Sequence, residues 1–336
     1  MTNKTLAIHQ YFPDASRLIL GTMNLGAWDE SPITTEDINQ AFDLVTEAID
    51  LGINVIDLAD IYTYGKSEKI IGELFKRERS LRHHLILQSK VGIKLPPINT
   101  STKITKQYDL SADWICESVN NSIKRLHNQN LDILFLHRPD PLLELEPMMQ
   151  ALSTLHEQGK FEYLAVSNMH AGQIAWLQSA TSIPIIANQL EMSLEKAGFV
   201  EDGITTNMSE NKQYGFPRGT LEFSQQAGIQ LQAWGALSQG LFGRDEVATD
   251  KLAYSEEKLR AINTTRELIQ TLSKEYEVEN NAIVLAWLLR HPSGIQPVLG
   301  TSKSSRLKAL SQATNIQLSK EHWYAIFEAS RGQEVP

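Results

Sequence analysis

The stretch Leu131-Asp132-Ile133-Leu134-Phe135-Leu136-His137 is an apolar run that ends on a polar residue. Its hydrophobicity is continuous rather than alternating, which is typical of a strand covered on both faces, as a parallel sheet requires. The segment before it has a helical period and carries Ile115, Val119, Ile123 and Leu126 along one side. Another helical segment follows it. The stretch therefore predicts a buried parallel strand between two covering helices.

The same alternation extends in both directions along the chain. Eight apolar runs are separated by helix-length sequence, at residues 17–22, 54–57, 85–90, 131–137, 163–168, 183–189, 229–234 and 295–300. Eight strand–helix units without a change of composition predict α/β architecture, a single (β/α)8 TIM-barrel domain over residues 1–336. An open doubly wound sheet is the alternative, but no G-x-G-x-x-G follows the first run, where a dinucleotide-binding open sheet has it.

The segments between the runs add two expectations. The helix after the first run has an apolar stripe at Ile38, Phe42, Val45 and Ile49, and Gly52 is available to end it. Three long connections, 92–109, 191–217 and 235–255, follow strands. In a barrel such loops lie at the C-terminal face, where we expect them to shape a pocket.

The composition limits the partners and the compartment. The 336 residues are 42% hydrophobic and carry a formal charge of −9, which disfavours broad binding to nucleic acid or to an anionic membrane. Cys116 is the single cysteine, so an intramolecular disulfide is impossible, and we expect an inert thiol. Neither a signal peptide nor an apolar segment of membrane-spanning length is evident. These features predict a cytoplasmic protein.

Polar or aromatic residues stand where the apolar runs end. Packing explains any one of them, since a barrel accommodates an ion pair or a hydrogen-bonded histidine. Parallel strands bring their C-terminal ends to one rim, so the set as a whole favours a functional site. These strand-end residues are Asp57, Lys90, His137, Ser167, Asn168, Gln189 and Trp234.

Tyr62 is the candidate proton donor, because it lies five residues beyond Asp57 on the turn that leaves the second strand. The pKa of a free tyrosine is near ~10. A lysine ammonium about 4 Å away, at an effective dielectric constant near 20, favours the phenolate by roughly 4 kcal/mol, or about three pKa units. We therefore expect Lys90 to lower the pKa of Tyr62. Asp57 would orient Lys90, and His137 would hold the substrate oxygen.

The remaining motifs bear on the source of electrons. The nine histidines show neither H-x-x-x-H nor H-E-x-x-H spacing, so no metal site is predicted. Neither G-x-S-x-G nor the phosphate-binding G-x-x-x-x-G-K occurs. A proton donor beside carbonyl-polarising groups then needs an external reductant, for which a nicotinamide is the simplest choice.

The motifs around these residues resemble those of the aldo-keto reductase family, in its bacterial general oxidoreductase type. Residues 52–62, followed by Gly65 and Ser67-Glu68, are similar to the signature around the catalytic Asp and Tyr. Residues 89–92 resemble the lysine motif, and residues 131–140 resemble the histidine motif. Further matches in the same order extend the resemblance over roughly residues 18–310.

The resemblance implies a role for each matching position. Asp57, Tyr62, Lys90 and His137 would form the catalytic tetrad, with Tyr62 as the general acid. Ser167, Asn168 and Gln189 would bind the nicotinamide carboxamide, and Trp234 would stack on the ring. The pyrophosphate would be wrapped by Gly235, Ala236, Leu237, Gln239 and Gly240, and Thr22 is grouped with these cofactor-binding residues.

NADPH rather than NADH is implied by the residues after the last apolar run. The adenosine 2′-phosphate would be received by Gly300, Thr301, Ser302, Lys303 and Arg306. Ala309-Leu310 replaces a Glu-Asn pair with which many family members contact adenine, so the adenine contacts differ here. Separately, Trp28, in the loop after the first strand, is a candidate wall of the substrate pocket.

The sequence therefore predicts NADPH-dependent reduction of an aldehyde or ketone, with a small-molecule carbonyl compound as substrate. The resemblance favours a monomer, with a homo-oligomer as the alternative. Two other functions stay open at this point. One is a non-catalytic regulatory subunit that binds the nucleotide on the same barrel. The other is a barrel hydrolase that uses paired carboxylates such as Asp140 and Glu191.

Overall fold

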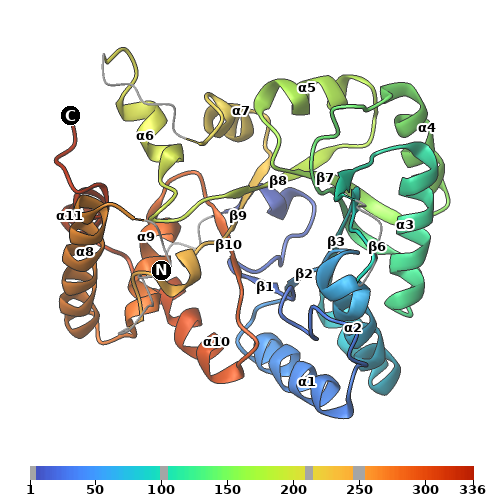
Figure 1. The fold of residues 1–336 in the computed structure, drawn as a ribbon, viewed down its shortest axis with the longest axis horizontal. Coiled ribbons are helices and arrows are strands. Elements are labelled where there is room, and N and C mark those ends of the chain that lie inside the picture. The colour runs from blue at the N-terminus through green and yellow to red at the C-terminus, as the bar shows by residue number, and fades with distance from the viewer. Residues whose placement is uncertain (1–4, 99–104, 209–214, 245–253) are drawn as a thin grey trace.

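The computed structural model describes residues 5–98, 105–208, 215–244 and 254–336. Its centre is a closed barrel of parallel strands in the order β1-β10-β9-β8-β7-β6-β3-β2, with helices packed around it (Figure 1). The predicted (β/α)8 fold is confirmed. Parts of the three long connections, residues 99–104, 209–214 and 245–253, lie outside the described residues, as do residues 1–4.

Each of the eight predicted runs overlaps a barrel strand, and β3, β7 and β8 extend one or two residues beyond theirs. The strands are β1 (Ile19–Gly21), β2 (Val55–Asp57), β3 (Ile86–Val91), β6 (Leu131–Leu136), β7 (Phe161–Ser167), β8 (Ile185–Glu191), β9 (Gln230–Trp234) and β10 (Gln296–Leu299). They are short, apolar and almost entirely buried because helices cover the outside and side chains fill the inside. The described part of the connection after β3 also forms a small antiparallel pair, β4 (Ile93–Lys94) with β5 (Gln107–Tyr108).

The helices that surround the barrel follow the predicted alternation. They are α1 (Thr35–Asp50), α2 (Lys66–Arg77), α3 (Ala112–Arg125), α4 (Leu145–Glu157), α5 (Ala171–Ser179), α6 (Gly198–Ile204), α7 (Thr220–Gln226), α8 (Glu256–Glu275), α9 (Asn280–Arg290), α10 (Ser304–Ser311) and α11 (Lys320–Arg331). In Figure 1, α8 and α11 lie side by side at one edge of the molecule, and the two pack together.

Helix α1 begins with a capping box. The Thr34 hydroxyl accepts a hydrogen bond from the Asp37 N–H at 3.1 Å, and the Asp37 carboxylate accepts one from the Thr34 N–H at 2.8 Å. Its buried face is centred differently from the predicted stripe: Ala41, Leu44, Val45 and Ala48 are buried, whereas the predicted Ile38, Phe42 and Ile49 are only partly buried. Two of these four buried positions are alanines, which a prediction based on large apolar side chains leaves out.

The core has two parts because strand side chains alternate between outside and inside. Outward-facing residues such as Ile56 and Leu134 pack against the helices, and inward-facing residues such as Val55 and Ile133 form a separate cluster inside the barrel. Ile8, from the single-turn helix η1 (Ala7–Gln10), joins the inner cluster and is fully buried. The N-terminal segment therefore closes one end of the barrel with apolar side chains.

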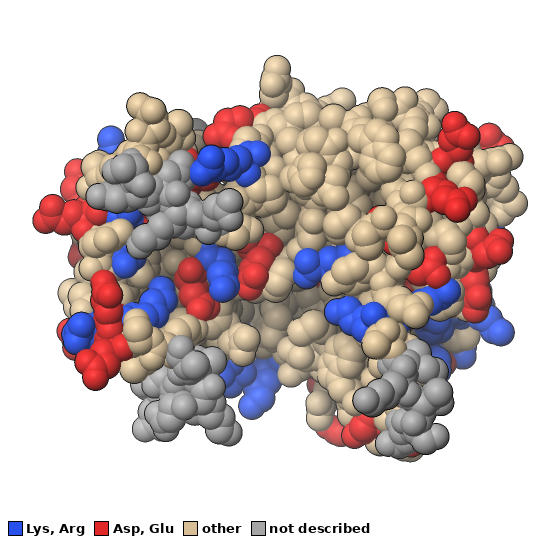
Figure 2. Space-filling view, turned by 45° about the horizontal axis from the view of Figure 1, so that its top comes forward, with Lys and Arg blue, Asp and Glu red and all other residues tan. Residues whose placement is uncertain are grey.

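The surface carries charges of both signs. Figure 2 shows acidic and basic side chains interspersed on one face, rather than gathered by sign into separate regions. This agrees with the modest formal charge of −9 spread over 336 residues. Among the described helices, none has both the length and the apolar character needed to cross a membrane.

Candidate active site

A polar layer occupies the other end of the barrel interior, where β2 and β3 finish. Lys90 is fully buried, and its ammonium donates hydrogen bonds to the Asp57 carboxylate at 2.6 and 2.7 Å. The same ammonium lies 3.0 Å from the Leu58 carbonyl oxygen and donates to the Tyr62 hydroxyl at 2.9 Å. The Tyr62 hydroxyl in turn donates to Asp57 Oδ2 at 3.3 Å. Three of the four predicted tetrad residues are thus in direct contact.

An unusual turn places the Tyr62 side chain over this pair. Thr63, Tyr64 and Gly65 follow Tyr62 with φ angles of 49°, 57° and 81°, all in the left-handed region. That region is unfavourable for a β-branched residue such as Thr63. The Thr63 hydroxyl, 2.8 Å from the Leu25 carbonyl oxygen, holds the turn by accepting a hydrogen bond from the Ser67 N–H at 3.0 Å. Backbone strain of this kind, about 1–3 kcal/mol per residue, concentrates at functional sites.

The pKa directions in this layer differ from the expectation. Burial, and then the negative charge of Asp57, raises the pKa of Tyr62 well above 10. Burial lowers the pKa of Lys90, and Asp57 opposes that shift. The expectation that Lys90 lowers the pKa of Tyr62 is therefore wrong for the protein chain alone, because it neglected desolvation and the Asp57 charge. Tyr62 holds its proton at neutral pH.

His137 lies on the rim beside the tyrosine. The His137 and Tyr62 rings meet edge-on with centroids 6.2 Å apart. Burial lowers the pKa of His137 well below 6.5, with further contributions from Lys90, Arg138 and Lys106. The imidazole is therefore neutral at pH 7. Its Nδ1 atom is buried and has no hydrogen-bond partner among the described residues.

Three buried glutamines complete the polar layer. Gln88 Nε2 donates to Asp57 Oδ1 at 2.6 Å, and Gln189 Nε2 donates to the same oxygen at 2.9 Å. Gln232 lies against both glutamines. Of the three, only Gln189 was predicted as a site residue, with a role in binding the cofactor; Gln88 and Gln232 were not. A signal was present, because Gln88 stands two residues before Lys90 and Gln232 two before Trp234, on the same face of each strand.

A second buried cluster, also missed, lies behind the tyrosine turn. Glu68 pairs with Arg125 at 2.7 Å and accepts a hydrogen bond from the Ser89 hydroxyl at 2.6 Å. Burial, followed by the charge of Glu68, raises the pKa of Asp60 to about 8, although Arg125 and Ser118 oppose the shift. Arg125 thus pairs with Glu68, and Asp60 lies near enough to both to feel their charges.

The residues predicted to bind the carboxamide come together at the ends of β7, β8 and β9. Asn168, with a left-handed φ of 60°, donates from Nδ2 to the Ser167 hydroxyl at 2.7 Å. Its Oδ1 accepts a hydrogen bond from Trp234 Nε1 at 3.1 Å. Trp234 is therefore held by its edge, and the Arg138 guanidinium lies 5.9 Å from its ring centre.

Thr22 is placed differently from the other predicted cofactor residues. It is fully buried, and its hydroxyl donates to the Asp57 carbonyl oxygen at 2.8 Å and accepts from the Ser67 hydroxyl at 2.8 Å. Both hydrogen-bonding directions of this side chain are used within the protein. Thr22 thus joins the end of β1 to the end of β2 and to α2.

The loop after β9 is a tight turn in which Gly235, Ser238, Gln239 and Gly240 all have positive φ angles. The backbone N–H groups of Ser238 and Gly240 donate within the loop, to the carbonyl oxygens of Gly235 and Leu237 at 2.8 Å. The φ of 85° at Gly240 favours glycine, and the side chain of Arg244 lies against this position. Ala236 is buried and Leu237 packs against the core. The turn and its arginine fit a pyrophosphate.

The residues after β10 form a second place suited to an anion. Thr301 accepts a hydrogen bond from the Lys303 N–H at 3.1 Å, which shapes the turn into α10. Ser302, Lys303 and Arg306 are exposed at the N-terminus of that helix, and a Cβ at Gly300 would meet nothing within 4 Å. Two cations and a helix N-terminus in open space fit a phosphate group.

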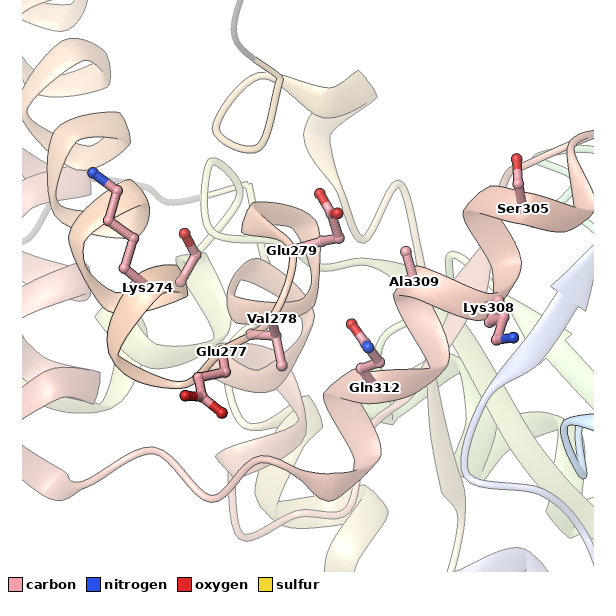
Figure 3. Close-up of a pocket in the computed structure, with 9 residues that line it drawn as sticks. Lys274, Glu277, Val278, Glu279, Ser305, Lys308, Ala309 and Gln312 are labelled. Carbon is pink, nitrogen blue, oxygen red and sulfur yellow. The ribbon is translucent and has the colours of Figure 1, made fainter.

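An open groove of about 550 Å³ lies beyond α10, between that helix and the turn from α8 into α9. Figure 3 shows Ala309 on α10, and Gln312 directly after that helix, facing Val278 and Glu279 across it. Ala309 is the first residue of the Ala309-Leu310 pair, which stands where many aldo-keto reductases have the Glu-Asn pair that contacts adenine. None of the tetrad residues lines this groove.

The remaining predicted residues lie at the rim or outside the polar layer. Trp28 is 47% exposed and meets the ring of Tyr64 edge-on at 5.9 Å, so it stands beside the tyrosine turn. Asp140, one of the carboxylates considered for a hydrolase, accepts hydrogen bonds from the backbone N–H groups of Leu110 and Leu142. Its oxygens stabilise loops. Glu191 is exposed at the end of β8.

Comparisons with known proteins agree on one family. The model of the Aldo/keto reductase family matches residues 17–331. The chain is 30% identical to 6-dehydroglucose reductase of Agrobacterium fabrum over 323 residues, covering 96% of each protein. It is also 30% identical to oxidoreductase YdhF of Escherichia coli over 327 residues, again covering 96% of each.

Solved structures share the fold. A glycerol dehydrogenase from Gluconobacter oxydans superposes with a TM-score of 0.78 at 20% identity, covering 96% of this chain and 94% of the other. The holo form of an aldo-keto reductase from Bacillus halodurans gives 0.73 at 22% identity, covering 95% and 94%. The chain therefore belongs to the aldo/keto reductase family and is an NAD(P)H-dependent oxidoreductase.

Proposed function

We propose that this protein reduces an aldehyde or ketone with NADPH and that Tyr62 protonates the carbonyl oxygen. The observation that carries the proposal is the contact of the Tyr62 hydroxyl with the buried Lys90 ammonium at 2.9 Å. A bound NADPH would supply the hydride that adds to the carbonyl carbon. The enzyme would act as a cytoplasmic monomer, with the whole chain as one barrel domain.

The residues of the polar layer divide the work of proton transfer. Hydride addition turns the carbonyl oxygen into an alkoxide, which is far more basic than a phenolate, so even a tyrosine with a raised pKa donates its proton to it. The neutral His137 lies next to Tyr62 and offers a hydrogen bond to the same oxygen. As the proton leaves, Lys90 stabilises the phenolate, and Asp57 keeps the ammonium in place.

The cofactor assignment rests on the donors around the rim. Ser167, Asn168 and Gln189 would orient the carboxamide, and Trp234 would cover one face of the ring. The left-handed turn at Gly235–Gly240 would receive the pyrophosphate. Lys303 and Arg306, exposed at the start of α10, would bind the 2′-phosphate and so select NADPH over NADH. Trp28 and Tyr64 would form a wall of the substrate pocket.

The alternative of a non-catalytic nucleotide-binding subunit is disfavoured by the polar layer itself. A regulatory nucleotide site does not require a buried cation against the Tyr62 hydroxyl or a strained turn beside it. The strain at Thr63 and Tyr64 and the burial of Lys90 both reduce stability, which is typical of residues that serve a reaction.

Tyr62→Phe tests the proposal. The phenyl ring keeps the packing but removes the proton, so turnover of a reactive aldehyde should fall about 10²- to 10⁴-fold. Binding of NADPH, followed by quenching of tryptophan fluorescence, should be retained. Unchanged turnover in this variant would refute the assignment of Tyr62 as the general acid.

A further inference from the structure

The buried glutamines form a connected unit that the proposed chemistry does not use. Gln88 Nε2 donates to Gln232 Oε1 at 2.9 Å, and Gln232 Nε2 donates back to Gln88 Oε1 at 2.9 Å. The two amides thus form a reciprocal pair of hydrogen bonds across the barrel, from β3 to β9. Both side chains are fully buried. We call these two residues the glutamine pair.

The glutamine pair contacts both halves of the site. Toward the tetrad, Gln88 donates its other N–H to Asp57 Oδ1 at 2.6 Å. Toward the predicted carboxamide site, Gln232 Oε1 accepts a hydrogen bond from Gln189 Nε2 at 3.0 Å. Gln189 donates its second N–H to Asp57 Oδ1 at 2.9 Å. Both amide hydrogens of Gln189 are therefore committed to the protein, which leaves its oxygen as the atom available to a ligand.

Strand register brings these residues to one level. Asp57 is opposite Gln88 in the pairing of β2 with β3, and Gln189 is opposite Gln232 in the pairing of β8 with β9. Apolar residues at Gln88 and Gln232 would fill the barrel at a lower cost in desolvation. A paired amide at this position gains directional contacts with Asp57 and Gln189, which apolar residues cannot provide.

We propose that Gln88 and Gln232 are positioning residues for the reaction. Gln88 fixes Asp57, and through it Lys90 and Tyr62, whereas Gln232 fixes the amide of Gln189 so that its oxygen faces the nicotinamide carboxamide. The inference rests on the proposed function. It adds that the two tasks are divided between the two glutamines, and that a single hydrogen-bonded unit coordinates them.

Methionine substitutions test this division, because methionine nearly matches glutamine in shape but cannot make the hydrogen bonds. In Gln88→Met, kcat for a reactive aldehyde should fall about 10- to 100-fold through misplacement of Asp57 and Lys90. The Kd for NADPH, from tryptophan fluorescence, should stay within about twofold. In Gln232→Met the Kd should rise about 2- to 10-fold, the loss expected for one hydrogen bond, and kcat should fall less than in Gln88→Met.

Gln230→Met is the matched control. Gln230 is a buried glutamine on the same strand as Gln232, but its amide donates to the carbonyl oxygens of Leu231 and Gly294. In the structure as described, Gln230 is hydrogen-bonded to neither Asp57 nor Gln189. Its substitution should lower the melting temperature and leave kcat and the Kd for NADPH within about twofold of the original protein.

Two further measurements separate positioning from folding. In Gln88→Met the amide of Gln232 loses its partner, whereas the double variant Gln88→Met/Gln232→Met removes both amides of the pair. The melting temperature of the double variant should therefore recover relative to Gln88→Met, while kcat stays low. In Gln88→Met the Asp57 carboxylate loses one hydrogen-bond donor, so its negative charge acts more strongly on Tyr62. The pKa of Tyr62 should therefore rise, and the alkaline limb of the kcat–pH profile should move to higher pH. Gln230→Met should not move that limb.

The outcomes are distinguishable from failure of the proposed function. If kcat and Kd stay within about twofold in both Gln88→Met and Gln232→Met, or if Gln230→Met loses as much activity as they do, the positioning role is wrong. If Tyr62→Phe is inactive at the same time, the proposed function survives that result. If Tyr62→Phe keeps full turnover, the proposed function itself fails, whatever the glutamine variants do.

Discussion

At the closed end of the barrel the interior holds Ile19 and Val55, whereas two residues further along β2, at the open end, it holds Asp57 beside Lys90 and Gln88. The same strands therefore build two unlike halves. The apolar half is specified by volume, and swaps that conserve volume are tolerated. The polar half is specified by partners, since each buried donor or acceptor needs its counterpart. The proposed chemistry lies in the half whose geometry is fixed by hydrogen bonds.

The largest effect should come from breaking the polar half at its cation. In Lys90→Met, the Asp57 carboxylate is left buried without a counter-charge, so unfolding free energy should fall by about 3–5 kcal/mol. Turnover should fall about 10²- to 10⁴-fold, because the phenolate of Tyr62 loses its stabilising charge. Urea titration and steady-state kinetics measure the two quantities.

The double variant Asp57→Asn/Lys90→Met is the control for this prediction. It removes the unpaired charge, so stability should recover in part while turnover stays low. If turnover recovered together with stability, the loss in Lys90→Met would reflect misfolding alone.

The apolar half should lose stability without losing chemistry. Ile19 is fully buried inside the barrel, and its register partners Val55 and Val298 are apolar. Ile19→Ala should lower the unfolding free energy by about 2–5 kcal/mol through lost burial and a cavity, and Ile19→Leu by less than about 1.5 kcal/mol. Turnover of the folded protein should stay within about twofold in both, since no hydrogen bond of the polar layer is removed. A large loss of turnover in the leucine variant would mean that the two halves are not independent.

The smallest effect concerns the cluster behind the tyrosine turn and depends on pH. Asp60, with a pKa raised to about 8, keeps its proton when the unfolded chain has already lost it. Rising pH between about 4 and 8 therefore favours the unfolded state, and this contribution is fully developed above the folded pKa. Asp60→Asn removes it, so the variant should gain stability over the original protein by about 1–3 kcal/mol from pH 5 to pH 8.

Asp37→Asn is a control for which the effect of pH on stability should have the opposite sign. Hydrogen bonds from Thr34 lower the pKa of Asp37, so its carboxylate stabilises the fold above a pH of about 4 and ceases to do so in acid. This variant should therefore be less stable than the original protein at neutral pH, and the two stabilities should converge at low pH. Parallel pH profiles for the Asp60→Asn variant and the original protein would show that Asp60 titrates normally.

Sequence patterns predict the apolar strands of the barrel better than they predict the polar layer. Continuous apolar runs mark all eight barrel strands, because strands buried on both faces cannot alternate. The residues at the strand ends, Asp57, Lys90 and His137, are recognisable because packing does not require them there. The glutamine pair is harder to detect, since a single Gln inside an apolar run has no meaning until the opposite strand is known. The pKa of Tyr62 was predicted in the wrong direction because burial is not visible in a sequence.

Transfer of deuterium from labelled cofactor tests the central claim most directly. The protein is incubated with NADPH deuterated at the reactive C4 position and a small aldehyde, and the alcohol is analysed by mass spectrometry. Our account predicts one deuterium on the carbinol carbon with the original protein and only a trace of product with Tyr62→Phe. Tight binding of the labelled cofactor with no labelled alcohol from any aldehyde or ketone offered would contradict it.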